Sequence, residues 1–131
     1  MTSSPIIVFV CEHGAAKSVI AATYFNKLAH KKGLDIKAVA RGTHPDKELS
    51  SKTVAGLLED GLIPVAPAPQ ELSFTDIENA QQIITFCELP IEFQKKTTIK
   101  QWENVPPVSE NYEDARDMII KHLNQLLADF I

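Results

Sequence analysis

The stretch Ile6-Ile7-Val8-Phe9-Val10-Cys11-Glu12-His13-Gly14-Ala15-Ala16-Lys17-Ser18 decides the fold, because an apolar run stops abruptly at a loop that leads into a helix. Residues 5–10 form a continuous, largely β-branched run, which predicts a central strand buried on both faces. From Ser18 onward apolar residues recur at helical spacing, and Gly33 ends the predicted helix. The chain therefore begins with a strand, a tight turn and a helix.

Strand and helix patterns alternate along the rest of the chain. Further strands are predicted at residues 36–40 and 82–87 and, on a weaker pattern, at 97–102. Helices are predicted from Ser50 or Ser51 to residue 60, at 74–79 with Ser73 or Thr75 near the start, and at 112–130. The proline-rich residues 63–69 are expected to form a surface loop. This order predicts an α/β protein, a three-layer α/β/α sandwich with a four-stranded parallel sheet.

The composition restricts the class of protein. A length of 131 residues fits one domain (1–131), and 44% hydrophobic residues suffice for a core without disulfides. The formal charge of −4 argues against nucleic-acid and anionic-membrane partners. Two cysteines do not make a disulfide framework, and the first apolar run is too short for a signal peptide, so we expect a cytoplasmic protein. The histidines and cysteines show no metal-ligand spacing, and no cofactor is expected.

The loop between the first strand and the first helix carries groups suited to a tetrahedral oxyanion. Such a turn directs backbone N–H groups inward, and the helix N-terminus adds partial positive charge. These dipoles would favour a thiolate on Cys11, while Lys17 adds a positive charge and the Ser18 hydroxyl can donate to sulfur. The alternative is that Cys11 is a small buried residue at a strand end. We expect the oxyanion to lie on the loop formed by Glu12, His13, Gly14, Ala15, Ala16 and Lys17.

This Cys-(x)5-basic-Ser loop resembles that of the low molecular weight protein tyrosine phosphatases and the related thioredoxin-coupled arsenate reductases. The similarity continues in order along the chain, at residues 42–45, 58–62, 83–87, Trp102 and 112–127. The resemblance implies that Cys11 attacks arsenate or a phosphate ester. It also implies Cys87 as a candidate redox partner of Cys11, with thioredoxin or another thiol as reductant. Both cysteines are predicted at carboxyl ends of parallel strands, which share one edge of the sheet.

The chain departs from the family pattern at several positions. Lys17 stands where the family has an arginine, and a lysine offers a point charge instead of a planar fork. Gly14 replaces an asparagine found in many members. The Glu12 carboxylate would repel anions if it faced the site, and would be harmless in solvent. The second redox cysteine is absent between residues 88 and 96.

The family's general acid, an aspartate before a proline, is also missing after Trp102. The alternative candidates for the general acid, chosen by their place in the sequence, are Glu103, His13 and His44. Two hypotheses about the function therefore remain. The protein is a thiol-dependent enzyme, or it is a family member that only binds phosphate or a similar oxyanion and acts in regulation. A nucleotide-binding P-loop fits less well, because Cys11 and Ala16 occupy its two glycine positions.

Overall fold

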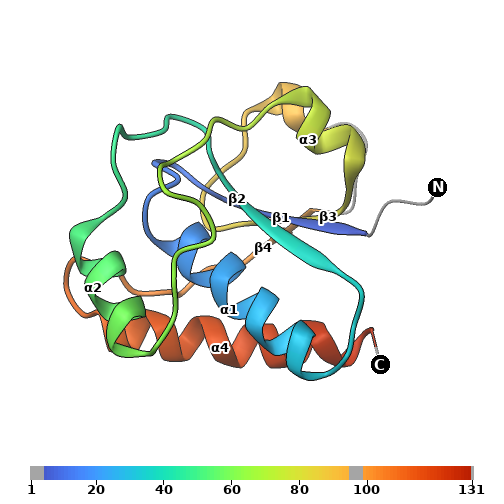
Figure 1. Cartoon of the computed structure of the whole chain (residues 1–131). Helices are drawn as coiled ribbons and strands as arrows, with labels where there is room; N and C mark the ends of the chain where they lie inside the picture. The colour runs from blue at the N-terminus through green and yellow to red at the C-terminus, as the bar shows by residue number, and fades with distance from the viewer. Residues whose placement is uncertain (1–4, 95–98, 131) are drawn as a thin grey trace.

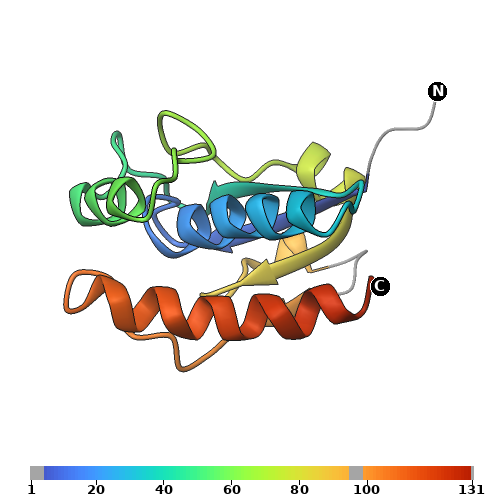
Figure 2. The ribbon, with the colours of Figure 1, turned by 60° about the horizontal axis from the view of Figure 1, so that its bottom comes forward.

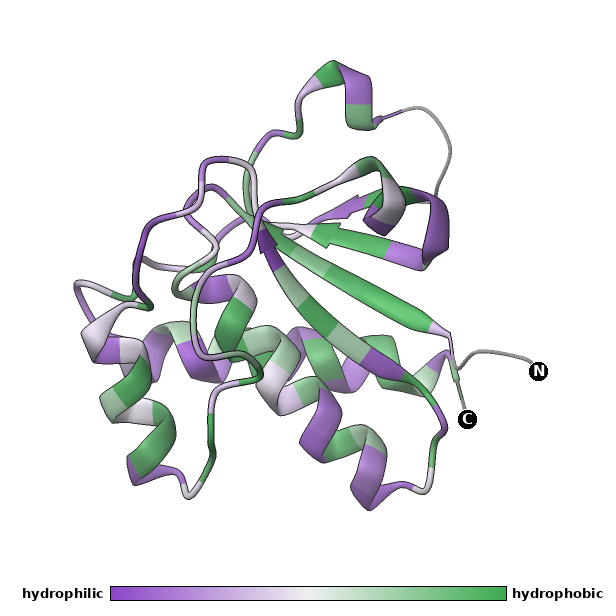
Figure 3. Cartoon of the chain, turned by 45° about the horizontal axis from the view of Figure 1, so that its top comes forward, coloured by the Kyte–Doolittle hydropathy of each residue, from purple (hydrophilic) through white to green (hydrophobic). Residues whose placement is uncertain are grey.

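The structure, a computed structural model, describes residues 5–94 and 99–130. Its centre is a parallel sheet in the order β2-β1-β3-β4, formed by β1 (Ile6–Cys11), β2 (Lys37–Gly42), β3 (Ala80–Thr85) and β4 (Ile99–Gln101) (Figure 1). Residues 7–10 of β1 are at most 1% exposed. Figure 3 shows a nearly continuous hydrophobic run along this strand. The prediction of a doubly covered central strand is confirmed.

The helices form where the sequence patterns predict them. They are α1 (Lys17–Lys31), α2 (Ser51–Glu59), α3 (Phe74–Asn79) and α4 (Tyr112–Ala128), with a short 3-10 helix η1 (Ile91–Phe93) that no pattern predicted. Of the alternative N-caps, the structure selects Ser50 and Ser73, whose hydroxyls accept hydrogen bonds from the backbone N–H groups of Thr53 and Asp76. Residues 63–69 form bends and irregular loop, as expected.

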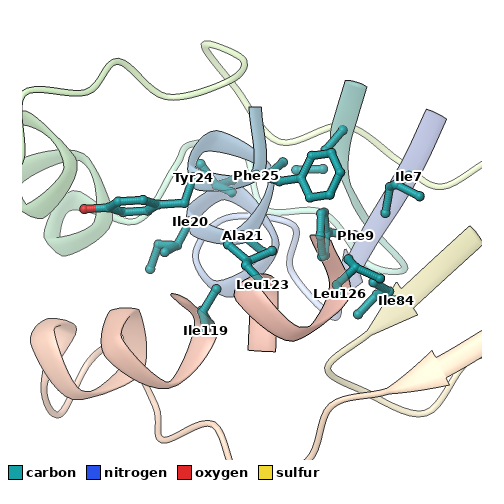
Figure 4. Packing of buried hydrophobic residues seen from close by; sticks show 14 of the residues in the cluster. Ile7, Phe9, Ile20, Ala21, Tyr24, Phe25, Ile84, Ile119, Leu123 and Leu126 are labelled. Atoms are coloured by element: carbon teal, nitrogen blue, oxygen red, sulfur yellow. The ribbon is translucent and has the colours of Figure 1, made fainter. Parts of the chain in front are cut away.

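The two faces of the sheet bury different sets of side chains. Ile7 and Phe9 of β1 face the larger core, which α1 and α4 cover while packing against each other (Figures 2 and 4). Val8 and Val10 face the other way, toward a smaller cluster to which α3 contributes Ile77. This division follows from the period of two along a strand. The predicted α/β/α sandwich with a four-stranded parallel sheet is confirmed, and its second helical layer is thin.

The carboxyl ends of β1 and β3 lie side by side at the point where the strand order reverses, which is where parallel sheets bind ligands. Cys11 is the last residue of β1. Strand β3 ends at Thr85, two residues before the predicted end at Cys87. The reason is a local turn, in which the Thr85 hydroxyl accepts from the Cys87 N–H (3.1 Å) and donates to the Cys87 carbonyl (2.7 Å). Cys87 thus lies just beyond the strand, at the same edge as Cys11.

The last strand is shorter than predicted. Residues 97 and 98 of the predicted 97–102 strand lie outside the described residues, and β4 ends at Gln101. Trp102 follows and turns into the larger core, where its ring packs against Phe9. Within the described residues, no helix combines the length and the apolar character that crossing a membrane requires.

A carboxylate just after α2 ties three helices together. The Asp60 side chain, 18% exposed, accepts hydrogen bonds from the hydroxyls of Tyr24 and Tyr112 and from the Arg116 guanidinium. In Figure 4 the Tyr24 hydroxyl points away from Phe9 and the rest of the labelled core. Burial alone would raise the pKa of Asp60, but the hydrogen bonds from both tyrosines and the Arg116 charge outweigh it and lower this pKa below its ordinary value.

Replacing this carboxylate should destabilise the protein in a pH-dependent way. Because the folded pKa of Asp60 is lowered, its contribution is present above the unfolded pKa and is lost as the pH falls through the folded value. We expect Asp60→Asn to cost about 1–3 kcal/mol at pH 7, because two tyrosine hydroxyls and Arg116 lose an ionised partner. Urea denaturation measures this cost, and the deficit should shrink below about pH 4.

Asp117 supplies the matched control, since it also pairs with Arg116 (2.9 Å) but is 65% exposed. Asp117→Asn should cost less than about 0.5 kcal/mol. Equal costs for the two variants at pH 7 would refute the importance of the Asp60 network.

Candidate functional site

The candidate site is built around a cysteine and a serine that flank the loop between β1 and α1. Cys11 is 8% exposed and Ser18 is fully buried in the first turn of α1. The Cys11 Sγ and the Ser18 Oγ lie 3.0 Å apart, which is within hydrogen-bonding distance for sulfur. A thiolate on Cys11 could therefore accept a hydrogen bond from the Ser18 hydroxyl.

The N-terminus of α1 is left open toward this pair. Its N-cap residue, Ala16, has no side chain that could accept a hydrogen bond, and the first turn holds no acidic residue. The first intrahelical bond runs from the Ile20 N–H to the Ala16 carbonyl (2.9 Å). The preceding N–H groups have no partner within a regular helix, so an anion can be bound there.

Backbone contacts with the segment after β2 hold the loop in shape. The Glu12 and His13 carbonyls accept hydrogen bonds from the N–H groups of His44 (2.7 Å) and Asp46 (3.0 Å). Gly14 has φ +60°, and a Cβ placed on it would lie 2.8 Å from the Gly42 nitrogen. The family's asparagine also tolerates a left-handed conformation, but the close Gly42 backbone leaves room here for glycine alone.

A cavity of about 400 Å³ opens beside the loop. The two cysteines and the charged residues of the loop share it with residues that the sequence did not assign to the site: Asp46, Ser50, Phe86 and residues 107–109. Its lining comprises Cys11, Glu12, His13, Ala15, Ala16, Lys17, Asp46, Ser50, Phe86, Cys87, Pro107, Val108 and Ser109. Ser18 lies beneath Cys11, and Gly14 is buried against Gly42. A larger hollow of about 580 Å³ beside β3 and β4 contains neither cysteine.

Lys17 lines the cavity, but its ammonium already has a partner. The Lys17 Nζ donates a hydrogen bond to the Val105 carbonyl at 2.9 Å. Lysine thereby links the loop to the segment that follows β4. An ammonium carries three donors, so this contact leaves two N–H groups for a ligand, without the paired geometry of a guanidinium.

Cys87 contributes a second thiol to the same cavity. Burial raises the pKa of this thiol, and the nearby Cys11 and Glu12 raise it further, whereas the Thr85 hydroxyl, 3.5 Å from the sulfur, acts in the opposite direction. Cys87 is therefore a protonated thiol near neutral pH. Both cysteines are free.

The segment after Trp102 brings no carboxylate to the cavity. Pro107, Val108 and Ser109 line it, whereas Glu103 is exposed and lies outside the lining. His44 is likewise outside it, with its Nδ1 3.3 Å from the Thr43 hydroxyl. Of the three alternative acids predicted from the sequence, the structure places His13 at the cavity. Among the described residues, no group of three or more histidine, cysteine, aspartate or glutamate side chains is arranged to hold a metal ion.

Residues 6–130 of the chain match the sequence model of a family described as low molecular weight phosphotyrosine protein phosphatase. The chain belongs to this family. The resemblance stated from the sequence is thereby confirmed for nearly the whole chain. No curated protein sequence matches the chain.

Several solved structures share the fold of this phosphatase family member. YfkJ from Bacillus subtilis is 24% identical with a TM-score of 0.85, over 98% of this chain and 95% of that one. An arsenate reductase from Archaeoglobus fulgidus is 24% identical with a TM-score of 0.75, over 93% and 98%. A low molecular weight phosphotyrosine phosphatase from Vibrio cholerae is 18% identical with a TM-score of 0.80, over 96% of each chain. At these identities the comparison supports the fold alone.

Proposed function

We propose that this protein is a thiol-dependent enzyme that acts on a small oxyanion, with hydrolysis of phosphate monoesters as its primary reaction. The observation that carries the proposal is the Cys11–Ser18 contact of 3.0 Å at the open N-terminus of α1, beside a cavity. Membership of the phosphatase family supports it. An inert oxyanion pocket would need neither the thiol nor the hydroxyl beneath it.

In the proposed reaction the Cys11 thiolate attacks phosphorus while the phosphate oxygens lie on the N–H groups of residues 12–17. Ser18 stabilises the thiolate by donating a hydrogen bond, and the helix dipole favours the anion. Lys17 contributes charge from the side of the cavity. Free thiols on Cys11 and Cys87 suit a reducing compartment, which agrees with the expected cytoplasmic location.

A second candidate reaction is reduction of arsenate, which the presence of Cys87 in the same cavity favours. The Cys11 thiolate would displace hydroxide from arsenate. The Cys87 thiol would give its proton to this hydroxide, forming water, and its sulfur would then attack the Cys11 sulfur. A disulfide forms, the arsenic–sulfur electron pair goes to arsenic, and As(V) leaves as As(III). Thioredoxin or another dithiol would reduce the disulfide. Mass spectrometry after arsenate turnover should detect a Cys11–Cys87 disulfide if this reaction occurs.

The test of the primary proposal combines turnover with labelling. Wild-type protein is assayed on p-nitrophenyl phosphate, and iodoacetamide labelling of Cys11 is followed below pH 8 with and without inorganic phosphate. We expect Cys11-dependent turnover, with Cys11 labelled faster than Cys87 and protected by phosphate. Protection without turnover on the ester or on arsenate would instead identify an oxyanion-binding, regulatory protein. Equal, slow labelling of both cysteines contradicts an activated thiol.

Replacing Lys17 by arginine should increase hydrolysis. Arginine can hold two oxyanion oxygens at once, so we expect kcat/KM on p-nitrophenyl phosphate to rise by about tenfold or more in Lys17→Arg. Lys31→Arg, an exposed change at the end of α1, serves as the control and should leave the rate unchanged. A Lys17→Arg rate equal to wild type would mean that the lysine is not what limits this site.

A further inference from the structure

The cavity needs a proton donor that the family's usual position does not provide. Hydrolysis of an unactivated ester requires a proton on the leaving oxygen, and no carboxylate from residues 103–109 reaches the cavity lining. Among the described lining residues, the titratable side chains are Cys11, Glu12, His13, Lys17, Asp46 and Cys87. The donor for this reaction must be sought in that set.

Most of these side chains already have another role or another contact partner. Cys11 is the nucleophile, and the Lys17 ammonium is bound to the Val105 carbonyl. Cys87 interacts with the Thr85 hydroxyl, beyond the end of β3. The exposed carboxylates of Glu12 and Asp46 both contact the ring of His13, at 3.6 and 3.3 Å. Histidine is the side chain that most often serves as a general acid or base, and His13 is the histidine in this cavity lining.

The ring of His13 lies between two carboxylates. Its Nδ1 lies 3.3 Å from Oδ1 of Asp46, and its Nε2 lies 3.6 Å from Oε2 of Glu12. The backbone hydrogen bond from the Asp46 N–H to the His13 carbonyl (3.0 Å) fixes the two residues relative to each other. An imidazolium would thus be paired on both nitrogens, and the shorter contact marks Asp46 as the positioning residue. The ring is half exposed, so it can turn to a substrate oxygen.

We propose that His13, positioned by Asp46, is the general acid and base of this site; the inference rests on the proposed ester hydrolysis. In the first step the sulfur–phosphorus bond forms and the phosphorus–oxygen ester bond breaks. The His13 imidazolium gives its proton to the leaving oxygen and becomes neutral. In the second step water attacks phosphorus, its proton passes to His13, and the sulfur–phosphorus bond breaks. Hydrogen phosphate leaves, and the thiolate and the imidazolium are restored.

The rival explanation is that the His13–Asp46 contact merely joins the two loops. The backbone hydrogen bonds of Glu12 and His13 already do so, and a joining role would affect every substrate equally. A general acid, in contrast, matters most when the leaving group is poor. Dependence on the leaving group therefore separates the two explanations.

The experiment compares kcat/KM on phenyl phosphate, a poor leaving group, with that on p-nitrophenyl phosphate, a good one. His13→Gln should lower the phenyl phosphate value by about 10²-fold or more and the p-nitrophenyl phosphate value by less than about tenfold. Asp46→Asn should give a smaller loss with the same dependence on the leaving group. His44→Gln, a change of the same type outside the cavity lining, should match wild type on both esters.

Equal losses of His13→Gln on both esters, or no loss on either, would overturn the assignment while leaving Cys11-dependent hydrolysis intact. Asp46→Asn equal to wild type on both esters would overturn the positioning role. If wild type shows no Cys11-dependent turnover of p-nitrophenyl phosphate, the proposed hydrolysis fails and this inference fails with it. Thermal unfolding midpoints confirm that each variant is folded.

Discussion

Cys11→Ser should reduce kcat on p-nitrophenyl phosphate by at least about 10³-fold, because a hydroxyl is far less ionised than a thiol and attacks phosphorus poorly. The change replaces sulfur by oxygen at a position that is 8% exposed and 3.0 Å from the Ser18 hydroxyl, so packing changes little. The free energy of unfolding should therefore shift by less than about 1.5 kcal/mol. Steady-state kinetics and urea denaturation on the same preparations measure both quantities.

Cys87→Ser provides the comparison that separates the two candidate reactions. It alters the other thiol of the cavity and should retain hydrolysis of p-nitrophenyl phosphate while abolishing thioredoxin-coupled arsenate reduction. Residual ester turnover of Cys11→Ser above a hundredth of the wild-type rate would contradict a nucleophilic Cys11. Loss of ester turnover in Cys87→Ser would show instead that hydrolysis depends on both thiols.

Phe9→Ala should have the largest effect on stability, about 3–5 kcal/mol. Phe9 is fully buried in β1, and its ring lies 6.0 Å from that of Phe25 and 5.7 Å from that of Trp102, centroid to centroid. Removing the Phe9 ring leaves a cavity between the sheet, α1 and the segment after β4. Since domains are stable by roughly 5–15 kcal/mol, the variant should unfold at a much lower urea concentration.

Phe74→Ala is the matched control, because Phe74 is 58% exposed and contacts Phe93 at the surface. It should cost less than about 1 kcal/mol. Similar urea midpoints for the two alanine variants would show that the aromatic contacts of β1 do not support the core as described.

The elements of the fold were predictable where local chemistry decides them. Some signals act within a few residues of the chain and can therefore be predicted from the sequence. They are the apolar run of β1, the Ser50 and Ser73 caps and the helix-ending Gly33. The end of β3 was misplaced because the Thr85 hydroxyl binds the Cys87 backbone, and a strand pattern does not reveal such a turn. The helix η1 is too short to show a period.

The candidate site also has one part that the sequence predicts and another part that only the fold brings together. The loop from Cys11 to Ser18 is contiguous, and its strand-loop-helix context indicates an oxyanion site without any tertiary information. Asp46 was missed because it follows a turn more than thirty residues later, and only the backbone pairing of the two loops brings it beside His13. The partner of Lys17, the Val105 carbonyl, has no sequence signal, because any residue has a carbonyl.

By itself, then, the sequence determined the α/β class, the position of the central strand and the loop that carries Cys11, Lys17 and Ser18. These properties depend on the periodicity and residue types of neighbouring positions. Only the tertiary structure decided that Cys87 shares the cavity, that Lys17 binds the segment after β4, and that His13 lies between two carboxylates. Apart from the contact between the neighbours Glu12 and His13, these contacts join residues far apart in the chain, and their geometry depends on how the sheet and its loops pack.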